Sequence, residues 1–387
     1  MDFAVTAKQQ QLIDEAARFA CAHLARQTHL PEGLSHYATH WNACATQGLT
    51  GLVLPVASGG RGLGLLDSLL MFEAMAASGA DPGFLFSLGV HQYAAALPLA
   101  SIGTSEQIAD LLPAMAAGRL CGGIAISEAD AGSDSYALKA TARPASDGCR
   151  DGFVLNGEKT WITNAPVAGL ILVCARSEDL PGAFGISCFI VESNRPGFQV
   201  IEGRKKIGLT SAPWGTVRLE NVPVPADRLL GGRGGGAAVF REAMRWERCG
   251  LFAIATGAMQ RNLDDCLGHC RSRRQFGKPL IDNPAVARTL ALMQTRLDAA
   301  RLLLYRAAWL LDAGTPDDVA IALAKAYVSE AAIANALDAQ QLEGAAGVLA
   351  DNAAVAFLND MLPFRTLSGP NELHYQVAAR LMQPSGR

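Results

Sequence analysis

The stretch from Ser127 to Asn164 carries the residue types that point most clearly to chemistry. It begins with Ser-Glu-Ala-Asp-Ala-Gly-Ser-Asp, a loop of small residues and acids, and ends with Leu-Asn-Gly-Glu-Lys-Thr-Trp-Ile-Thr-Asn, where Asn156-Gly157 predicts a turn. Small residues let backbone N–H groups approach a ligand closely. Trp161 offers a broad apolar face, and Ser127 and Thr163 offer hydrogen bonds to ring heteroatoms. Together they predict one wall of a site for a flat, polar, aromatic cofactor, and hence redox chemistry.

Two further patterns could do chemistry but are better explained as structure. The glycine-rich run at 231–236 could cradle a phosphate, yet it lacks the Lys-Ser/Thr of a P-loop and no strand–helix unit surrounds it, so a flexible connector is favoured. The nine cysteines are scattered without a Cys-x-x-Cys pair, which favours core thiols in a reducing compartment. Zinc-ligand spacing is absent, so no metal is expected.

The elements that must position the cofactor wall fall into three segments. Apolar residues recur at helical spacing near the start, at Leu12, Ala16 and Ala20, and this helical character continues to about residue 118. Short β-rich runs punctuated by Gly, Pro and Asp then predict an antiparallel sheet or barrel. Later helical runs cover 240–271, 285–313, 316–343, 352–361 and 372–382. The sequence therefore predicts an α+β fold with an α-helical domain over 1–118, a β-barrel-like domain over 119–228 and a helical bundle domain over 229–387.

Composition and charge restrict the class of protein. Half of the 387 residues are hydrophobic and 18% are charged, which is enough for a large core. The formal net charge of −3 argues against a nucleic-acid binder, which normally carries a basic stripe. No run of 18 apolar residues predicts a membrane span, and the segment from Met1 to Leu12 lacks an apolar signal core. A cytoplasmic location is the resulting expectation.

Three more segments carry a resemblance to a known family. Arg-Arg-Gln-Phe-Gly-Lys-Pro-Leu at 273–280 is similar to an Arg-x-x-Phe-Gly-Lys segment, and Asp-Ala-Gln-Gln-Leu-Glu-Gly-Ala-Ala-Gly at 338–347 to Gln-x-x-Gly-Gly-x-Gly. Leu-Ser-Gly-Pro-Asn-Glu-Leu-His at 367–374 is similar to a C-terminal segment that covers a flavin. With the helix–sheet–helix order and the 127–164 wall, the chain resembles the acyl-CoA dehydrogenase family over nearly its whole length. The resemblance implies a C-terminal four-helix bundle.

The resemblance also implies FAD, bound at a dimer interface within a tetramer. The residues that would contact FAD are Ile126, Ser127, Gly132 and Ser133 along the isoalloxazine and pyrophosphate, Trp161 and Thr163 against the ring, Arg273, Gln275 and Phe276 from a neighbouring subunit, Gln341 and Gly344 at the adenosine end, and Glu372. A guanidinium fork at Arg273 suits a pyrophosphate, but a solvated charge is the alternative. For Gln341 the alternative is a polar residue on a helix face.

The reaction of such a family needs a base for the α-proton, while the cofactor takes the β-hydride. Most members place a Glu immediately before the Gly of the C-terminal segment, and here that position is Ser368. The isovaleryl and long-chain branches carry the base on the first helix after the β-domain, a position that Glu247 matches. Beside Trp246, a buried carboxylate has a raised pKa and is a better base. The alternative is a surface Glu paired with Arg248 or Arg245.

The combination of Trp246-Glu247 with Ser368-Gly369 resembles the branch that oxidises prolyl groups on a peptidyl carrier protein. Tyr375 stands where the family commonly has Arg, and weaker contacts to CoA would suit a carrier-protein substrate. An acyl-CoA dehydrogenase of branched or long chains and a non-catalytic flavin-binding homologue are the alternatives. The electron acceptor is expected to be an electron-transfer flavoprotein or oxygen. The substrate-binding residues by this resemblance are Ser133, Trp246, Arg248, Ser368 and Gly369.

Overall fold

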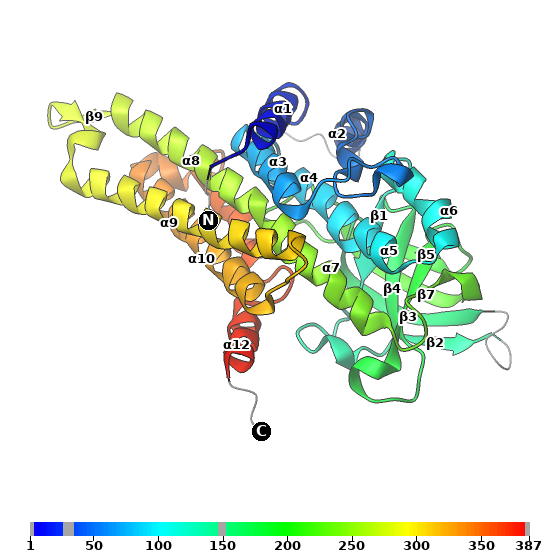
Figure 1. The fold of residues 1–387 in the computed structure, drawn as a ribbon. Helices are drawn as coiled ribbons and strands as arrows, with labels where there is room; N and C mark the ends of the chain where they lie inside the picture. The colour runs from blue at the N-terminus through cyan, green and yellow to red at the C-terminus, as the bar shows by residue number, and fades with distance from the viewer. Residues whose placement is uncertain (1–3, 26–34, 146–151, 384–387) are drawn as a thin grey trace.

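A computed structural model describes residues 4–25, 35–145 and 152–383 of the chain. The N-terminal helices pack above one end of a central sheet, and long C-terminal helices extend away from it (Figure 1). The predicted order of helices, sheet and helices is confirmed. The N-terminal helices are α1 (Ala7–His23), α2 (Ser35–Thr46), α3 (Leu65–Ala77), α4 (Pro82–Gly89), the π-helix η3 (Val90–Ala96), α5 (Leu97–Ile102) and α6 (Ser105–Ala116).

Helix starts follow residues that satisfy the free N–H groups of a first turn. Thr6 and Thr104 each form a capping box with the Gln three positions later, which starts α1 and α6. Asp81 accepts two first-turn N–H bonds ahead of Pro82 in α4. Asp317 does the same for α10 (Asp318–Leu342). Local sequence therefore fixes where these helices begin.

The central sheet holds eight strands, paired in the order β6-β7-β3-β2-β4-β5-β8, with β1 pairing on β4. Their bounds are β1 (Gly122–Ala125), β2 (Thr141–Pro144), β3 (Phe153–Thr163), β4 (Leu170–Arg176), β5 (Ile186–Glu192), β6 (Phe198–Glu202), β7 (Trp214–Val224) and β8 (Leu229–Leu230). The sheet is mostly antiparallel, as predicted, but β4 pairs in parallel with both β1 and β2. The chain passes from the N-terminal helices into the sheet at β1. It then forms β2 and β3 before it returns to pair β4 with β1.

The turn predicted at Asn156-Gly157 was also wrong. Both residues lie inside β3, where the pairing with β7 shifts register between Leu155 and Gly157. Gly157 adopts φ +140°, and a Cβ atom there would lie 2.6 Å from the Cβ of Ala140. The Asn-Gly pair therefore forms a β-bulge that lets β2 approach closely, and not a reversal of the chain.

The C-terminal helices are α7 (Gly236–Gly250), α8 (Phe252–Ser272), α9 (Pro284–Asp312), α10, α11 (Ala353–Met361) and α12 (Asn371–Met382). The single helical run predicted for 240–271 is two helices, which meet at Leu251. The glycine-rich run at 231–236 connects β8 to α7, as predicted. A small hairpin of β9 (Arg274–Gln275) and β10 (Lys278–Pro279) joins α8 to α9 at the end far from the sheet (Figure 1).

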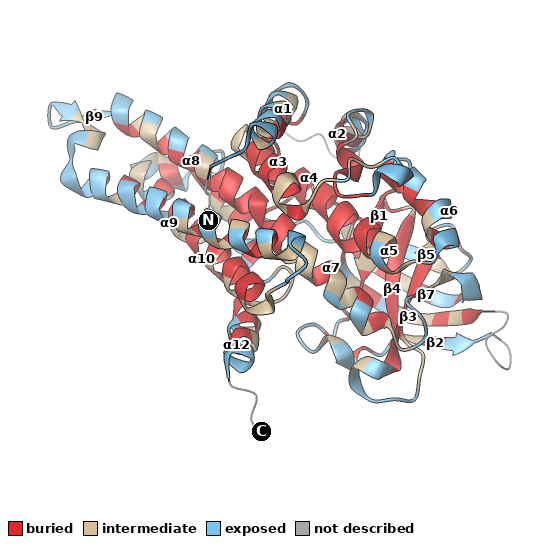
Figure 2. Ribbon diagram, viewed as in Figure 1, coloured by how far each residue is buried: buried red, intermediate tan, exposed pale blue. Residues whose placement is uncertain are grey.

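Buried residues form two cores, one on each side of the sheet. Figure 2 shows buried segments along both the strands and the helices that surround them. The larger core joins the N-terminal helices, one sheet face and the C-terminal helices, and the smaller core fills the other face. Seven cysteines are buried, Cys21 is exposed and Cys149 lies outside the described residues. Two described helices, 82–102 and 318–342, are long and apolar enough to cross a membrane, but 83% and 67% of those windows are buried within the protein.

Glu73 of α3 joins the N-terminal and C-terminal helices through a buried network. Its Oε1 accepts a bond from Arg301 Nε at 2.5 Å, and its Oε2 accepts from the Tyr305 hydroxyl at 2.6 Å and from Thr256 Oγ1 at 2.9 Å. Glu73 is only 5% exposed. The buried charge of Glu73 is therefore balanced by Arg301 and by two hydroxyl donors.

Replacing Glu73 with Gln should lower the apparent free energy of unfolding by about 1.5–3 kcal/mol, because one charge-assisted bond is lost and an amide donor faces two hydroxyls. Urea unfolding followed by circular dichroism measures this change. The control is Asp67→Asn on the same helix, whose partner Lys8 is 69% exposed; it should cost less than about 1 kcal/mol. Equal losses in both variants would contradict the role given to Glu73.

Candidate active site

The predicted cofactor wall is assembled by the end of β1 and the end of β3. The carbonyl oxygen of Ser127 accepts a bond from the backbone N–H of Thr160 at 2.9 Å. Asn164, which ends this stretch, is fully buried and donates to the carbonyl oxygens of Ser87 at 3.1 Å and Gly122 at 3.0 Å. The structure therefore brings Ile126, Ser127, Trp161 and Thr163 together, as the sequence predicted.

A buried ion pair that the sequence reasoning missed holds the first loop of this wall. Lys159 of β3 is fully buried, and its Nζ donates to Glu128 Oε1 at 2.7 Å and to the Ile126 carbonyl at 3.0 Å. The Glu128 carboxylate also accepts the backbone N–H groups of Lys139 at 2.6 Å and Ala140 at 2.9 Å. Burial alone would raise the pKa of Glu128, but these bonds lower it overall, so Glu128 is anionic at neutral pH.

Trp161 has the exposure and backbone conformation of a ligand-facing residue. It is 69% exposed and adopts φ +63°, where the pairing of β3 with β7 is irregular between Lys159 and Ile162. Its indole stacks on that of Trp214, with ring centroids 4.8 Å apart and planes 1° from parallel. Next to it, Thr160 Oγ1 is buried without a hydrogen-bond partner among the described residues. An open aromatic face beside an unpaired hydroxyl fits a flat ring with polar atoms, such as a flavin.

Glu247 of α7 is the second centre of the site. The side chain is buried, and burial raises the pKa of Glu247 above the ordinary value of 4.5. The Ser368 hydroxyl donates to Glu247 Oε1 at 2.5 Å, and it opposes this rise, as does the nearby charge of Arg248. Arg245 pairs instead with Asp318, at 2.8 Å between Nε and Oδ1. The alternative of a surface carboxylate in an ion pair is therefore not what the structure contains.

Most of the predicted substrate-binding residues gather around Glu247. Arg248 Nε donates to the Ser368 carbonyl oxygen at 3.2 Å, and Gly369 follows directly. Trp246 is half-buried and donates through Nε1 to Glu242 at 3.2 Å. Ser133, with Gly132, is exposed in the loop after β1. The structure therefore confirms that Ser368 contacts Glu247, while the contact of Ser368 with a substrate stays a prediction.

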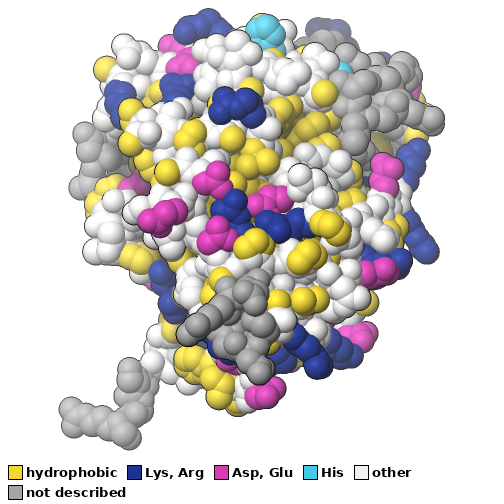
Figure 3. All heavy atoms as spheres, turned by 90° about the vertical axis from the view of Figure 1, so that its right-hand side faces the viewer, with side chains coloured by type: hydrophobic (Ala, Val, Ile, Leu, Met, Phe, Trp, Pro, Cys, Tyr) yellow, Lys and Arg dark blue, Asp and Glu magenta, His cyan; other side chains and the backbone are white. Residues whose placement is uncertain are grey.

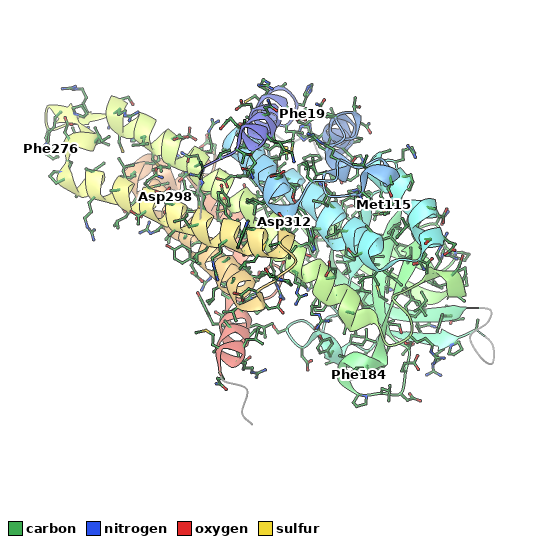
Figure 4. The ribbon with its side chains drawn as sticks, viewed as in Figure 1. Phe19, Met115, Phe184, Phe276, Asp298 and Asp312 are labelled. Carbon is green, nitrogen blue, oxygen red and sulfur yellow. The ribbon has the colours of Figure 1, made fainter. Side chains whose placement is uncertain are left out.

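The remaining predicted FAD contacts lie on the C-terminal helices and the hairpin between them. Arg273, Gln275 and Phe276 are exposed at the β9–β10 hairpin, where Phe276 is 97% exposed and marks the tip of the molecule (Figure 4). Gln341, Gly344 and Glu372 are exposed at the end of α10 and the start of α12. The exposed hairpin of a single copy lies away from the sheet, and the role of Arg273, Gln275 and Phe276 at another subunit stays a prediction. The FAD contacts of Gln341, Gly344 and Glu372 also stay predictions.

The surface beyond the sheet carries charges of both signs. Figure 3 shows Lys and Arg interspersed with Asp and Glu on that face, and not a continuous basic stripe. Before β8, Arg228 pairs with both Asp110 and Glu192, at 2.6 and 2.8 Å.

Two residues that the sequence reasoning missed carried a usable signal. Lys325 is a lone cation within the apolar helical run 319–328, and the structure places it fully buried. Lys159 of β3 is buried, as are Leu155 and Ile162 of the same strand. The register shifts in β3 interrupt the simple alternation of buried and exposed residues, so the sequence pattern does not show this clearly. A lone charge at a core position of either kind indicates a buried polar partner.

Comparison with known proteins matches three consecutive parts of the chain to the three domains of one family. The N-terminal, middle and C-terminal domain models of acyl-CoA dehydrogenases match residues 6–119, 123–222 and 234–383. An L-prolyl-[peptidyl-carrier protein] dehydrogenase of Pseudomonas fluorescens is 40% identical over 343 residues, 89% of this chain and 90% of that protein. The enzyme of the same name from a Serratia species is 35% identical, with 98% of each chain covered.

Solved structures agree with these relatives. "PigA with FAD and proline" matches with a TM-score of 0.93 and 34% identity, covering 99% of both chains. The prolyl acyl carrier protein oxidase AnaB matches with a TM-score of 0.90 and 30% identity, covering 98% of this chain and 100% of its own. An isovaleryl-CoA dehydrogenase of Solanum tuberosum is also 30% identical, over 96% of this chain and 90% of its own.

Proposed function

Because the chain belongs to the acyl-CoA dehydrogenase family, an FAD-dependent oxidoreductase family, we propose that it oxidises a prolyl group held as a thioester on a peptidyl carrier protein. The observation that carries this proposal is the buried Glu247, whose Oε1 is bonded to the Ser368 hydroxyl. In this pairing the C-terminal segment supplies a hydroxyl, and α7 supplies the carboxylate. The occurrence of Glu at 247 together with Ser at 368 is also what makes the sequence resemble the prolyl branch of the family.

In the proposed reaction, Glu247 removes the α-proton of the thioester. The raised pKa of this buried carboxylate brings its basicity closer to neutral pH than that of an exposed Glu. Arg248 stands beside it and holds the Ser368 carbonyl oxygen. Bound FAD supplies the acceptor for the hydride. Ser127, Trp161 and Thr163 would hold the flavin ring, and the Lys159–Glu128 pair would keep their loop in place.

The nature of the carrier is a separate part of the proposal. Both curated relatives named above act, by name, on prolyl groups attached to a peptidyl carrier protein. Tyr375, which replaces a common Arg, is exposed on α12 and offers no charge to a CoA phosphate. A phosphopantetheine arm lacks the adenosine 3'-phosphate, so it would not need that charge. Secondary metabolism is the proposed context.

Assembly, location and electron acceptor complete the proposal. We propose a homo-oligomer, a dimer of dimers, in which the exposed hairpin of one copy reaches the FAD of another; the 97% exposure of Phe276 supports a covering partner. The seven buried thiols are compatible with a cytoplasmic location. The electrons would pass to an electron-transfer flavoprotein or to oxygen.

Anaerobic flavin bleaching tests this function. The purified holoenzyme is mixed with prolyl-loaded carrier protein, and separately with prolyl-CoA, isovaleryl-CoA and a long-chain acyl-CoA. Bleaching is expected with the loaded carrier and to be much slower with the CoA esters. Bleaching by isovaleryl-CoA alone would favour the second candidate, an acyl-CoA dehydrogenase, for which the potato relative is the supporting observation. Absence of bleaching by every thioester would favour a non-catalytic flavoprotein.

A further inference from the structure

We propose that Lys325 is a positioning residue for the reaction base, acting through the segment 365–371, whose Ser368 hydroxyl is bonded to Glu247. This inference rests on the proposed role of Glu247. Lys325 lies on α10 and Glu247 on α7, and the segment between η9 (Leu362–Arg365) and α12 connects them.

The ammonium group of Lys325 donates three hydrogen bonds to the segment 365–371. Nζ donates to the carbonyl oxygens of Gly369 at 2.7 Å and Arg365 at 3.1 Å, and to Asn371 Oδ1 at 2.8 Å. Lys325 is fully buried, and Nζ lies 5.4 Å from the centre of the Phe252 ring. A buried cation is stable only where its donors are hydrogen-bonded. Lys325 therefore needs the acceptors of the segment, and the segment in turn is held in place by Lys325.

The backbone of the segment is strained at the residue that faces the base. Ser368 adopts φ +54°, a left-handed conformation that residues other than glycine rarely adopt. Its carbonyl oxygen accepts bonds from Arg248 Nε at 3.2 Å and from His374 Nε2 at 3.1 Å. Burial lowers the pKa of His374 to about 4, so its ring is neutral and Nε2–H is the donor. Such strain persists only where surrounding bonds impose it.

This arrangement assigns different tasks to the two oxygens of Glu247. Oε1 accepts the Ser368 hydroxyl, and among the described residues no protein donor contacts Oε2. Oε2 is therefore the oxygen free to take a proton. If the segment relaxes, the Ser368 hydroxyl leaves Oε1, the carboxylate loses a bond that favours its charged form, and the pKa of Glu247 rises.

Only a few charged groups influence the protonation of Glu247 and of Lys325. Arg248 is the charged group that acts on Glu247. Burial lowers the pKa of Lys325 to about 7, and the charged or titratable groups that face it are Arg248 of α7, Glu330 of α10, Arg365 of η9, and Glu372 and His374 of α12. Two routes connect Lys325 to the pKa of Glu247: the charge of Lys325 itself, or the position of the Ser368 hydroxyl. The two routes predict different pKa values for Glu247 when Lys325 and Ser368 are both replaced.

The test compares Lys325→Met, Ser368→Ala and the double variant with the wild-type holoenzyme. The first readout is the protonation of Glu247, followed as the carboxyl band in pH-difference infrared spectra that Glu247→Gln removes. The second is the pH profile of anaerobic flavin reduction by saturating prolyl-loaded carrier protein. Each single variant is expected to raise the apparent pKa of Glu247 by about one unit and to slow reduction about tenfold at pH values below that pKa, with KM little changed.

The double variant is expected to match Ser368→Ala, because Lys325 has no further effect once the hydroxyl is gone. Lys325→Arg should restore most of the wild-type profile. The control Arg365→Gln changes a surface charge of the same segment, whose partner Glu330 is 42% exposed, and keeps its backbone acceptor; its rate should stay within about twofold. Should Lys325→Met not purify with flavin, Lys325→Gln takes its place under the same criteria.

Additive shifts in the double variant, or an unchanged Glu247 pKa in Lys325→Met, would overturn the positioning role. The infrared titration needs no substrate. If no thioester reduces the wild-type flavin but the titration shows the expected dependence on Lys325, the proposed function fails and the positioning of Glu247 stands. If the flavin is reduced normally and the titration shows no dependence, the positioning role alone fails.

Discussion

Replacing Glu247 with Gln is expected to slow anaerobic flavin reduction by a thioester substrate ~10²–10⁴-fold, the usual contribution of a positioned general base. Gln keeps the size of the side chain and can still accept the Ser368 hydroxyl through its amide oxygen, so the fold and the flavin content should be unchanged. What is lost is the carboxylate that takes the α-proton. Single-turnover stopped-flow measurement at the flavin absorbance isolates this step from product release.

The pH profile gives the same variant a second signature. Burial raises the pKa of Glu247 above 4.5, and only the deprotonated carboxylate can act as base. Wild-type reduction should therefore slow as the pH falls through that raised pKa, and the residual rate of Glu247→Gln should lack this limb. The control is Glu242→Gln, one helical turn earlier, which keeps an acceptor for Trp246 Nε1. A wild-type rate in Glu247→Gln would refute the base assignment.

Much of the fold follows from local sequence. The helices α9 and α10 begin beside Asn283-Pro284 and Asp317, residues whose side chains and ring geometry favour a helix start, and both were predicted within two residues. The bulge at Gly157 was not predictable in the same way. Asn-Gly is a common hairpin turn, and only the tight approach of Ala140, which directly precedes β2, distinguishes a bulge from a turn.

The site was predictable where a motif is continuous and not where it depends on distant partners. Trp161 and Thr163 could be placed close together from the sequence because both lie in one strand. The bond between Ser368 and Glu247 joins residues 121 positions apart, and no local pattern indicates it. The same holds for the stack of Trp161 on Trp214, which places two strands in register. Such contacts arise from tertiary packing, which short-range periodicity does not record.

Replacing Lys159 with Met is expected to lower the free energy of unfolding by about 3–5 kcal/mol, because it leaves the buried Glu128 carboxylate without its cation. The loop that follows β1 would then lose the bonds from Nζ to Glu128 and to the Ile126 carbonyl. Ser127 and Ser133 belong to that loop, so the variant should also purify with less FAD. The absorbance ratio of flavin to protein and the urea midpoint measure the two effects.

Two further variants separate charge from shape. Lys139→Met removes a neighbouring lysine of the same loop, whose bond to Asp130 joins side chains that are 74% and 76% exposed; it should cost less than about 1 kcal/mol and keep its flavin. The double variant Lys159→Met/Glu128→Gln removes the unpaired charge and should recover part of the lost stability, because much of the cost is the isolated carboxylate. Recovery of stability without recovery of flavin would indicate that the Nζ bond to Ile126 shapes the cofactor wall. Wild-type stability and flavin content in Lys159→Met would show that the buried pair holds neither the loop nor the cofactor.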